Sequence, residues 1–112
     1  MLFCQAMLET GWLGYSGSSV KSTQFNFAGI GATDVNPKPA TFSSAQIGMR
    51  AQIQHLKAYA SKENLKQECV DPRFHLVTRG VAPNVEDLVG RWATDPDYGN
   101  KILGLLAKLM SV

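Results

Sequence analysis

The first ten residues place the strongest constraint on how this chain can fold. Within residues 2–10 the side chains are apolar except at three positions, Gln5, Glu9 and Thr10. A helix that is apolar on almost every side is buried in the protein, and Gly11 is able to end it in a left-handed conformation. Gln5 and Glu9 are four residues apart and therefore share one face. The sequence predicts a buried helix with a carboxylate in its last turn.

That carboxylate is unusual because acidic residues are scarce around it. Residues 1–62 contain only Glu9 and Asp34 among the nine acidic residues of the chain. Apolar neighbours disfavour the charged form of a carboxyl, so we expect a raised pKa for Glu9. A carboxylic acid of raised pKa is what glycoside hydrolysis uses to protonate a leaving oxygen. The alternative is a helix-end glutamate that reaches water past Gly11 and has no chemical role.

The rest of the chain predicts a mainly α protein of about five helical segments. They cover residues 2–10, 44–61, 72–77, 85–93 and 96–110. The second begins with a serine N-cap, and its expected apolar stripe consists of Met49, Ile53, Leu56 and Ala60. The buried stripe of the last helix is expected to consist of Ile102, Leu106 and Leu109.

A small irregular or β lobe is expected between the first two helices. Residues 14–24 are rich in Gly and Ser and predict a loop, and the prolines in residues 36–39 exclude regular structure there. Thr41 and Phe42 form a candidate short strand that pairs back toward Ile30. Two short strands are marginal alone, so this lobe depends on the helices for its stability.

Composition excludes several classes of protein. A hydrophobic share of 45% and a charged share of 18% argue against disorder, and the length predicts a single domain over residues 1–112. The net charge of +2 does not point to nucleic acid. No apolar stretch approaches the length of a membrane span, and residues 1–8 do not resemble a signal peptide.

Metal, cofactor and nucleophile motifs are also missing from the sequence, and we predict no metal and no cofactor. Cys4 and Cys69 are far apart and form no metal-ligand spacing. They fit two small buried hydrophobic residues, and a disulfide between them in an exported protein stays open. His55 and His75 fit structural hydrogen bonds better than catalysis, because neither has a nucleophilic partner arrangement.

Four aromatic residues are candidates for the walls of a sugar site, because pyranose faces stack on flat apolar rings. They are Trp12, Tyr15, Trp92 and Tyr98. The alternative for each is a place in the core or at its rim.

Four motifs, at residues 9–12, 26–31, 92–93 and 98–102, resemble in this order the motifs of the bacterial endo-β-N-acetylglucosaminidase family. Residues 9–12, Glu-Thr-Gly-Trp, resemble the glutamate motif of that family. Residues 26–31, Asn-Phe-Ala-Gly-Ile-Gly, resemble its Asn-Asn-x-Phe-Gly-Ile-Lys segment, and Phe42 before a helix resembles its entry to the next helix. Trp-Ala at 92–93 and Tyr-Gly-Asn-Lys-Ile at 98–102 resemble its late motifs. The similarity runs through nearly the whole chain.

The resemblance implies a lysozyme-like fold, in which an α bundle and a small β lobe flank a glycan cleft. It implies cleavage of the β-1,4 bond after N-acetylglucosamine in peptidoglycan. Glu9 would be the general acid and Tyr98 the site tyrosine beside it. Asn26 and Phe27 match cleft-lining positions, and Trp12 and Trp92 are candidate substrate-binding aromatics.

Two departures from the family pattern carry further expectations. Family members often have a second carboxylate in the lobe, where this chain offers only Asp34. The substrate's own 2-acetamido group is the alternative, as in some glycosidases. The family usually has a helix before the glutamate helix, so we expect this domain to lack its first helix. The apolar face left uncovered would favour self-association.

We therefore expect an extracellular or cell-wall-associated hydrolase, whose export signal lies outside this chain. One alternative is a lysozyme-like module that binds cell-wall glycan with little cleavage. Another is an N-acetylmuramoyl-L-alanine amidase, although that chemistry usually needs a zinc site or a Cys/His pair.

Overall fold

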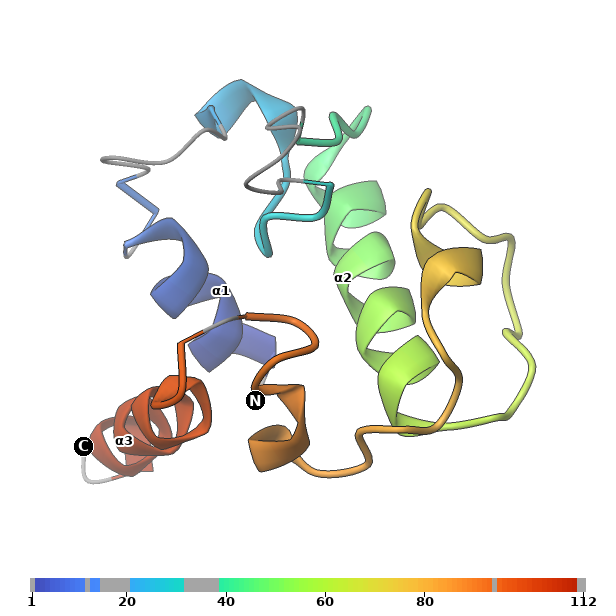
Figure 1. The fold of residues 1–112 in the computed structure, drawn as a ribbon. Helices are drawn as coiled ribbons and strands as arrows, with labels where there is room; N and C mark the ends of the chain where they lie inside the picture. Colours follow the sequence, from blue (N-terminus) through green and yellow to red (C-terminus); the bar gives the residue numbers. More distant parts are fainter. Residues whose placement is uncertain (1, 12, 15–20, 32–38, 94, 111–112) are drawn as a thin grey trace.

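A computed structural model of the chain describes residues 2–11, 13–14, 21–31, 39–93 and 95–110. This part contains three α-helices, α1 (Leu2–Thr10), α2 (Ala45–Ala60) and α3 (Tyr98–Met110). It also contains three single 3-10 turns, at Ser22–Gln24, Phe74–Leu76 and Val85–Leu88. The mainly α prediction is confirmed, whereas about five helices and a β lobe are wrong for the described residues, which include no strand. Figure 1 shows α1 lying between α2 and α3.

Helix α1 has the predicted bounds and end. Gly11 follows it with a φ of +57°, a left-handed conformation that favours glycine. Thr10 closes the last turn, because its hydroxyl donates to the Ala6 carbonyl and accepts from Leu13 N at 2.9 Å. The helix buries Gln5 completely, but Phe3 is half exposed. The prediction of burial on every side is therefore correct only for the face that meets α2 and α3.

Helix α2 also has the predicted cap, since the Ser44 hydroxyl accepts a hydrogen bond from Ile47 N at 3.2 Å. The predicted apolar stripe is wrong, because Met49 and Ile53 are each about half exposed. The buried positions are Gly48, Ala51, Gln52, Gln54 and Ala58.

Close approach of the lobe explains why α2 buries this face. A Cβ on Gly48 would lie 1.8 Å from the Phe25 carbonyl oxygen, so only glycine allows this packing. Gln54 is buried because it binds the chain beside it: its side-chain oxygen accepts from Val70 N and Asp71 N. Small residues and paired amides replace the large apolar side chains that the periodicity predicted.

The lobe is held by backbone hydrogen bonds without becoming a sheet. Ala40 N donates to the Ile30 carbonyl at 2.9 Å, and Phe42 N donates to the Gln24 carbonyl at 2.8 Å. The segment around Phe42 therefore does pair back toward Ile30, as predicted, but not as a strand. Phe42 and Ile30 pack with Ala28 and Ala51 of α2 in a small core.

The second half of the chain is less helical than predicted. The helix expected over 85–93 is a single turn, Val85–Leu88, and the one over 72–77 is reduced to Phe74–Leu76. Gly90 has a φ of +77° and its N–H donates to the Ala93 carbonyl at 2.7 Å. This reversal ends the turn early and places Trp92 at the bend.

Helix α3 begins at Tyr98 rather than at residue 96. Asp95 organises this start, since its carbonyl accepts from Tyr98 N. Ile102 is 1% exposed in a core with Cys4, Leu88 and Tyr98. Leu109 of the predicted stripe is about half exposed.

Cys4 and Cys69 are both free thiols, one buried and one exposed. Among the described helices, none has the length and apolar character that crossing a membrane requires.

Candidate active site

The site is centred on a hydrogen bond between the two ends of the chain. The Tyr98 hydroxyl, at the start of α3, donates to Glu9 Oε1, in the last turn of α1, at 2.8 Å. Tyr98 is only 3% exposed, whereas Glu9 is half-buried and reaches the surface. Packing of α1 against α3 brings these residues together, although they are 89 positions apart.

The environment favours the neutral form of Glu9. Burial raises the pKa of this carboxyl above its ordinary value, while hydrogen bonds from Tyr98 and the Trp92 indole act in the opposite direction. Burial and the neighbouring Glu9 charge raise the pKa of Tyr98, so its hydroxyl stays a proton donor. Glu9 is therefore an oriented carboxyl that is easier to protonate than an exposed glutamate.

A chain of buried amides supports this pair from below. The Gln5 side-chain nitrogen donates to the Tyr98 hydroxyl at 3.0 Å, and the Gln52 nitrogen donates to the Gln5 oxygen at 3.0 Å. Gln5 and Gln52 are 0% and 1% exposed. The chain Gln52–Gln5–Tyr98–Glu9 links α2, α1 and α3. The predicted common face of Gln5 and Glu9 is confirmed, since both side chains meet the same hydroxyl.

A cavity of about 150 Å³ is lined by two residues that are neighbours of the Glu9 carboxyl. Gly29 and Trp92 line it, and both also border Glu9. A Cβ on Gly29 would lie 3.7 Å from Glu9 Oε2, and the Trp92 indole is near enough to lower the pKa of the same carboxyl. The Glu9 carboxyl therefore lies near a space that a ligand can enter, with Gly29 and Trp92 between them.

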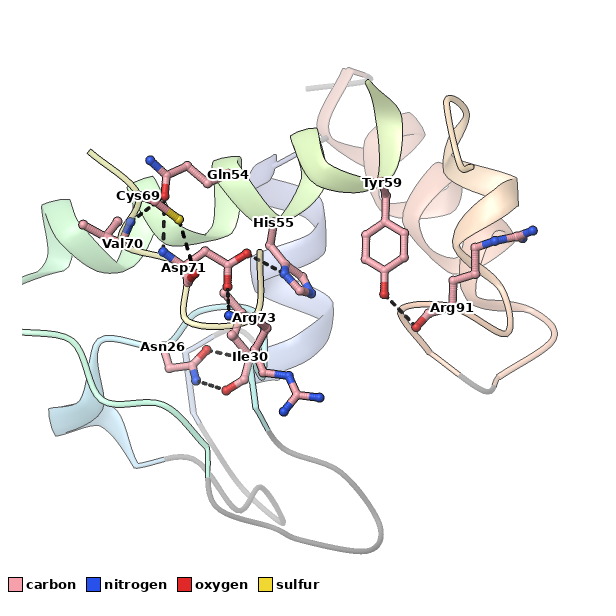
Figure 2. A network of polar contacts seen from close by, with 10 residues as sticks. All are labelled: Asn26, Ile30, Gln54, His55, Tyr59, Cys69, Val70, Asp71, Arg73 and Arg91. Atoms are coloured by element: carbon pink, nitrogen blue, oxygen red, sulfur yellow. Dashed lines mark hydrogen bonds and ion pairs between the residues drawn. The ribbon is translucent and has the colours of Figure 1, made fainter. Parts of the chain in front are cut away.

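Polar side chains from α2 and the following loop form another wall of this cavity. His55 Nδ1 lies 2.6 Å from Asp71 Oδ2, and the His55 ring packs edge-on against Trp92 with centroids 4.7 Å apart. Figure 2 shows Asp71 between Gln54 and His55. The structural hydrogen bond expected for His55 is thus present. His75, by contrast, is exposed beside Phe74.

Comparison with known proteins identifies the family. The family described as "Mannosyl-glycoprotein endo-beta-N-acetylglucosaminidase" matches residues 1–111. The chain belongs to this glucosaminidase family. A protein of Borreliella burgdorferi described as "Uncharacterized protein" is 49% identical over 108 residues, covering 96% of this chain and 52% of the relative. The chain thus spans about half the length of that curated relative. No solved structure gives a significant match.

The family resemblance found in the sequence is confirmed. Of the predicted site residues, the fold brings Glu9, Tyr98 and Trp92 together. Asp34 and Trp12 lie outside the described residues, as does Tyr15.

Asn26 has a different position from the one expected in a cleft wall. It is 0% exposed, and its side-chain nitrogen donates to the carbonyls of Ile30 and Ala40. Its side-chain oxygen accepts from the N–H groups of Ala28 and Ile30. Asn26 therefore shapes the loop that carries Gly29 to the candidate site. Phe27 beside it is half-buried.

Sequence reasoning missed Gln52, Asp71 and Arg73. The apolar periodicity of α2 does not mark Gln52. A glutamine that falls on the buried face of a helix is the signal that would have found it.

The groups that the amidase alternative requires are not assembled in the described part of the chain. No cluster of three or more His, Cys, Asp or Glu side chains there could hold a metal ion. The exposed Cys69 thiol donates to the Asp71 carbonyl at 3.4 Å.

Proposed function

We propose that this domain is a peptidoglycan hydrolase that cleaves the β-1,4 bond after N-acetylglucosamine, with Glu9 as the general acid. The observation that carries the proposal is the Glu9 carboxyl itself: it has a raised pKa, receives the Tyr98 hydrogen bond and lies beside Gly29, which lines the cavity. Family membership supplies the glycan class of the substrate. Such a hydrolase acts at the cell wall, outside the membrane.

In the proposed step, protonated Glu9 gives its proton to the glycosidic oxygen as the bond to the anomeric carbon breaks. The leaving sugar departs as an alcohol, and Glu9 becomes a carboxylate. Tyr98 stabilises that carboxylate, because its hydroxyl already donates to Oε1 and a hydrogen bond to a charged acceptor is stronger than to a neutral one. In this proposal Trp92, which lines the cavity, stacks on a sugar ring next to the acid.

The electron-deficient anomeric carbon then needs a second group. Asp71 is not available for this role, because it is 3% exposed and its two oxygens bind His55 and the Arg73 N–H. Asp34 is one candidate, as base or stabiliser. The 2-acetamido oxygen of the substrate is the other: it attacks the carbon to form a cyclic intermediate that water opens.

The decisive experiment compares wild-type protein with Glu9→Gln on purified cell wall. New reducing ends are counted, and Glu68→Gln serves as the matched control because Glu68 is exposed. General acid catalysis contributes about 10²- to 10⁴-fold, so Glu9→Gln should lose at least about 100-fold. Equal rates for wild type and Glu9→Gln would refute the role of Glu9.

The same assay separates the other candidate functions. Binding to wall glycan with no new reducing ends would favour the glycan-binding module over the hydrolase. New free amino groups in place of reducing ends would favour the amidase over the hydrolase.

A further inference from the structure

The cavity beside Glu9 has a cationic lining. Its charged or titratable lining residues are Arg73, Arg91, His55 and Tyr59, and no Asp or Glu is among the described residues that line it. Asp71 lies behind His55 and is fully engaged, with 3% exposure. An anion in the cavity would therefore meet positive groups first.

The two arginines differ in what holds them. The Arg91 guanidinium donates to the Asp87 carbonyl at 3.0 Å, so part of its hydrogen-bonding capacity is used within its own turn. No hydrogen bond or ion pair of the Arg73 guanidinium is found among the described residues. Figure 2 shows this guanidinium extending past Ile30 with no dashed line to it.

The backbone of Arg73 is fixed, even though its guanidinium has no partner among the described residues. Asp71 Oδ1 accepts from Arg73 N at 2.9 Å, and Asp71 Oδ2 holds His55 Nδ1. One buried carboxylate thus orients both residues at the cavity and leaves His55 Nε2 for a ligand. The positive charge of Arg73 reaches the Tyr59 hydroxyl across the same cavity, where it opposes the burial that raises the pKa of Tyr59.

We propose that Arg73 is a specificity-determining residue that binds a carboxylate of the glycan close to the bond that is cleaved. A guanidinium pairs with a carboxylate through two parallel hydrogen bonds, which fixes orientation as well as charge. Gly29 and Trp92 line this cavity and also border Glu9. A carboxylate in the cavity would therefore belong to a sugar at or next to the reacting one.

This inference rests on the proposed function for the kind of glycan. In peptidoglycan, two sources supply such a carboxylate: the 3-O-lactyl group of an N-acetylmuramoyl unit, and the peptide attached to it. Neutral oligomers of N-acetylglucosamine have the same sugar backbone without any carboxylate. Arg73 should distinguish these glycans even if the chain proves to bind them without cleaving them.

The test is a set of binding measurements by titration calorimetry on the full chain carrying Glu9→Gln, which prevents turnover. Three glycans are compared: neutral N-acetylglucosamine oligomers, peptide-free wall glycan with free lactyl carboxylates, and wall glycan that retains its peptides. Each is titrated into the parent protein and into Arg73→Gln, Arg73→Lys and Arg50→Gln. Arg50 is the matched control, because it is a half-buried arginine of α2 that lines a different pocket from the cavity of Arg73 and His55.

Arg73→Gln should weaken binding of a carboxylate-bearing glycan about 10- to 100-fold, the range for a hydrogen-bonded charge. Its affinity for the neutral oligomers should stay within about twofold, and Arg50→Gln should match the parent. Arg73→Lys should give an intermediate loss, because it keeps the charge and loses the paired geometry. Raised salt should reduce the advantage of the anionic glycans.

Loss restricted to the peptide-free glycan assigns the lactyl carboxylate, and loss restricted to the peptide-bearing glycan assigns the peptide. An equal loss on all three glycans, or no loss on any, would overturn the proposal. Melting curves of the Arg73 variants show whether an equal loss of binding comes from unfolding. If Arg73→Gln is unfolded, the binding of the three glycans to Arg73→Lys decides whether the proposal stands. Failure of Glu9→Gln to reduce cleavage in the separate rate assay would instead refute the proposed hydrolysis.

Discussion

Replacing Tyr98 with Phe removes one oxygen atom at the centre of the site. That oxygen donates to Glu9 at 2.8 Å and accepts from the Gln5 amide at 3.0 Å. The ring itself stays, so the packing of a side chain that is 3% exposed is preserved. The variant therefore separates the two hydrogen bonds from the shape of the core.

The two bonds predict effects on stability and on activity. Without the hydroxyl, the buried Gln5 nitrogen loses its acceptor, which costs about 1–3 kcal/mol. For a domain of this size, each kcal/mol lowers the melting temperature by roughly 4 °C. The Glu9 carboxylate loses a donor worth about 1.5–3 kcal/mol, and a less well-oriented acid should reduce kcat about 10- to 100-fold.

The direction of the pH effect follows from the same bond. The Tyr98 hydroxyl favours ionised Glu9 and so lowers its pKa, which means that Tyr98→Phe should raise the Glu9 pKa further. Activity that needs protonated Glu9 falls as pH rises through that pKa. The alkaline limb of the pH–rate profile should therefore move to higher pH in Tyr98→Phe, even though the maximal rate is lower.

The assay is reducing-end release across pH, together with melting curves. Tyr59→Phe is the control, because Tyr59 also lines the cavity but its hydroxyl donates to the Arg91 carbonyl. Gln5→Leu combined with Tyr98→Phe removes both partners of the Gln5–Tyr98 bond, but it also removes the oxygen that accepts from the buried Gln52 amide, so the double variant should recover neither the stability nor the rate. An alkaline limb that stays in place or moves to lower pH in Tyr98→Phe would refute this account of Glu9.

Three further predictions concern stability. Because the folded-state pKa of Glu9 is raised, its charge costs stability as pH rises through that pKa; Glu9→Gln should melt higher than wild type at neutral pH and equally below the unfolded-state pKa. Asn26→Leu leaves several backbone groups of the lobe without partners and should cost at least about 3 kcal/mol in urea unfolding. Gly48→Ala should destabilise, because the new Cβ would lie 1.8 Å from the Phe25 carbonyl; Gly104→Ala in α3, with nothing within 4 Å, should instead stabilise by up to about 1 kcal/mol. A stabilising Gly48→Ala would contradict the packing of the lobe on α2.

Local signals in the sequence were reliable where a few neighbouring residues decide the structure. The end of α1 at Gly11 and the Ser44 cap of α2 depend on backbone conformation and on one nearby hydroxyl, so they could be predicted. The helix expected over 85–93 failed because capping residues define a start but not a length. Leu88 packs into the core and Gly90 turns the chain, which ends the helix after one turn.

The sequence by itself determined that Glu9 would stand almost alone among apolar neighbours, and its motifs indicated that Tyr98 would accompany it. Only the tertiary structure decided how the pair is held. Gln5 and Gln52 are acceptable in the core because each amide finds a partner on another helix, and such pairing has no periodic signature. The place of Arg73 in the cavity lining, with no partner for its guanidinium among the described residues, is likewise a property of the fold, because it depends on which groups the folded chain brings around it.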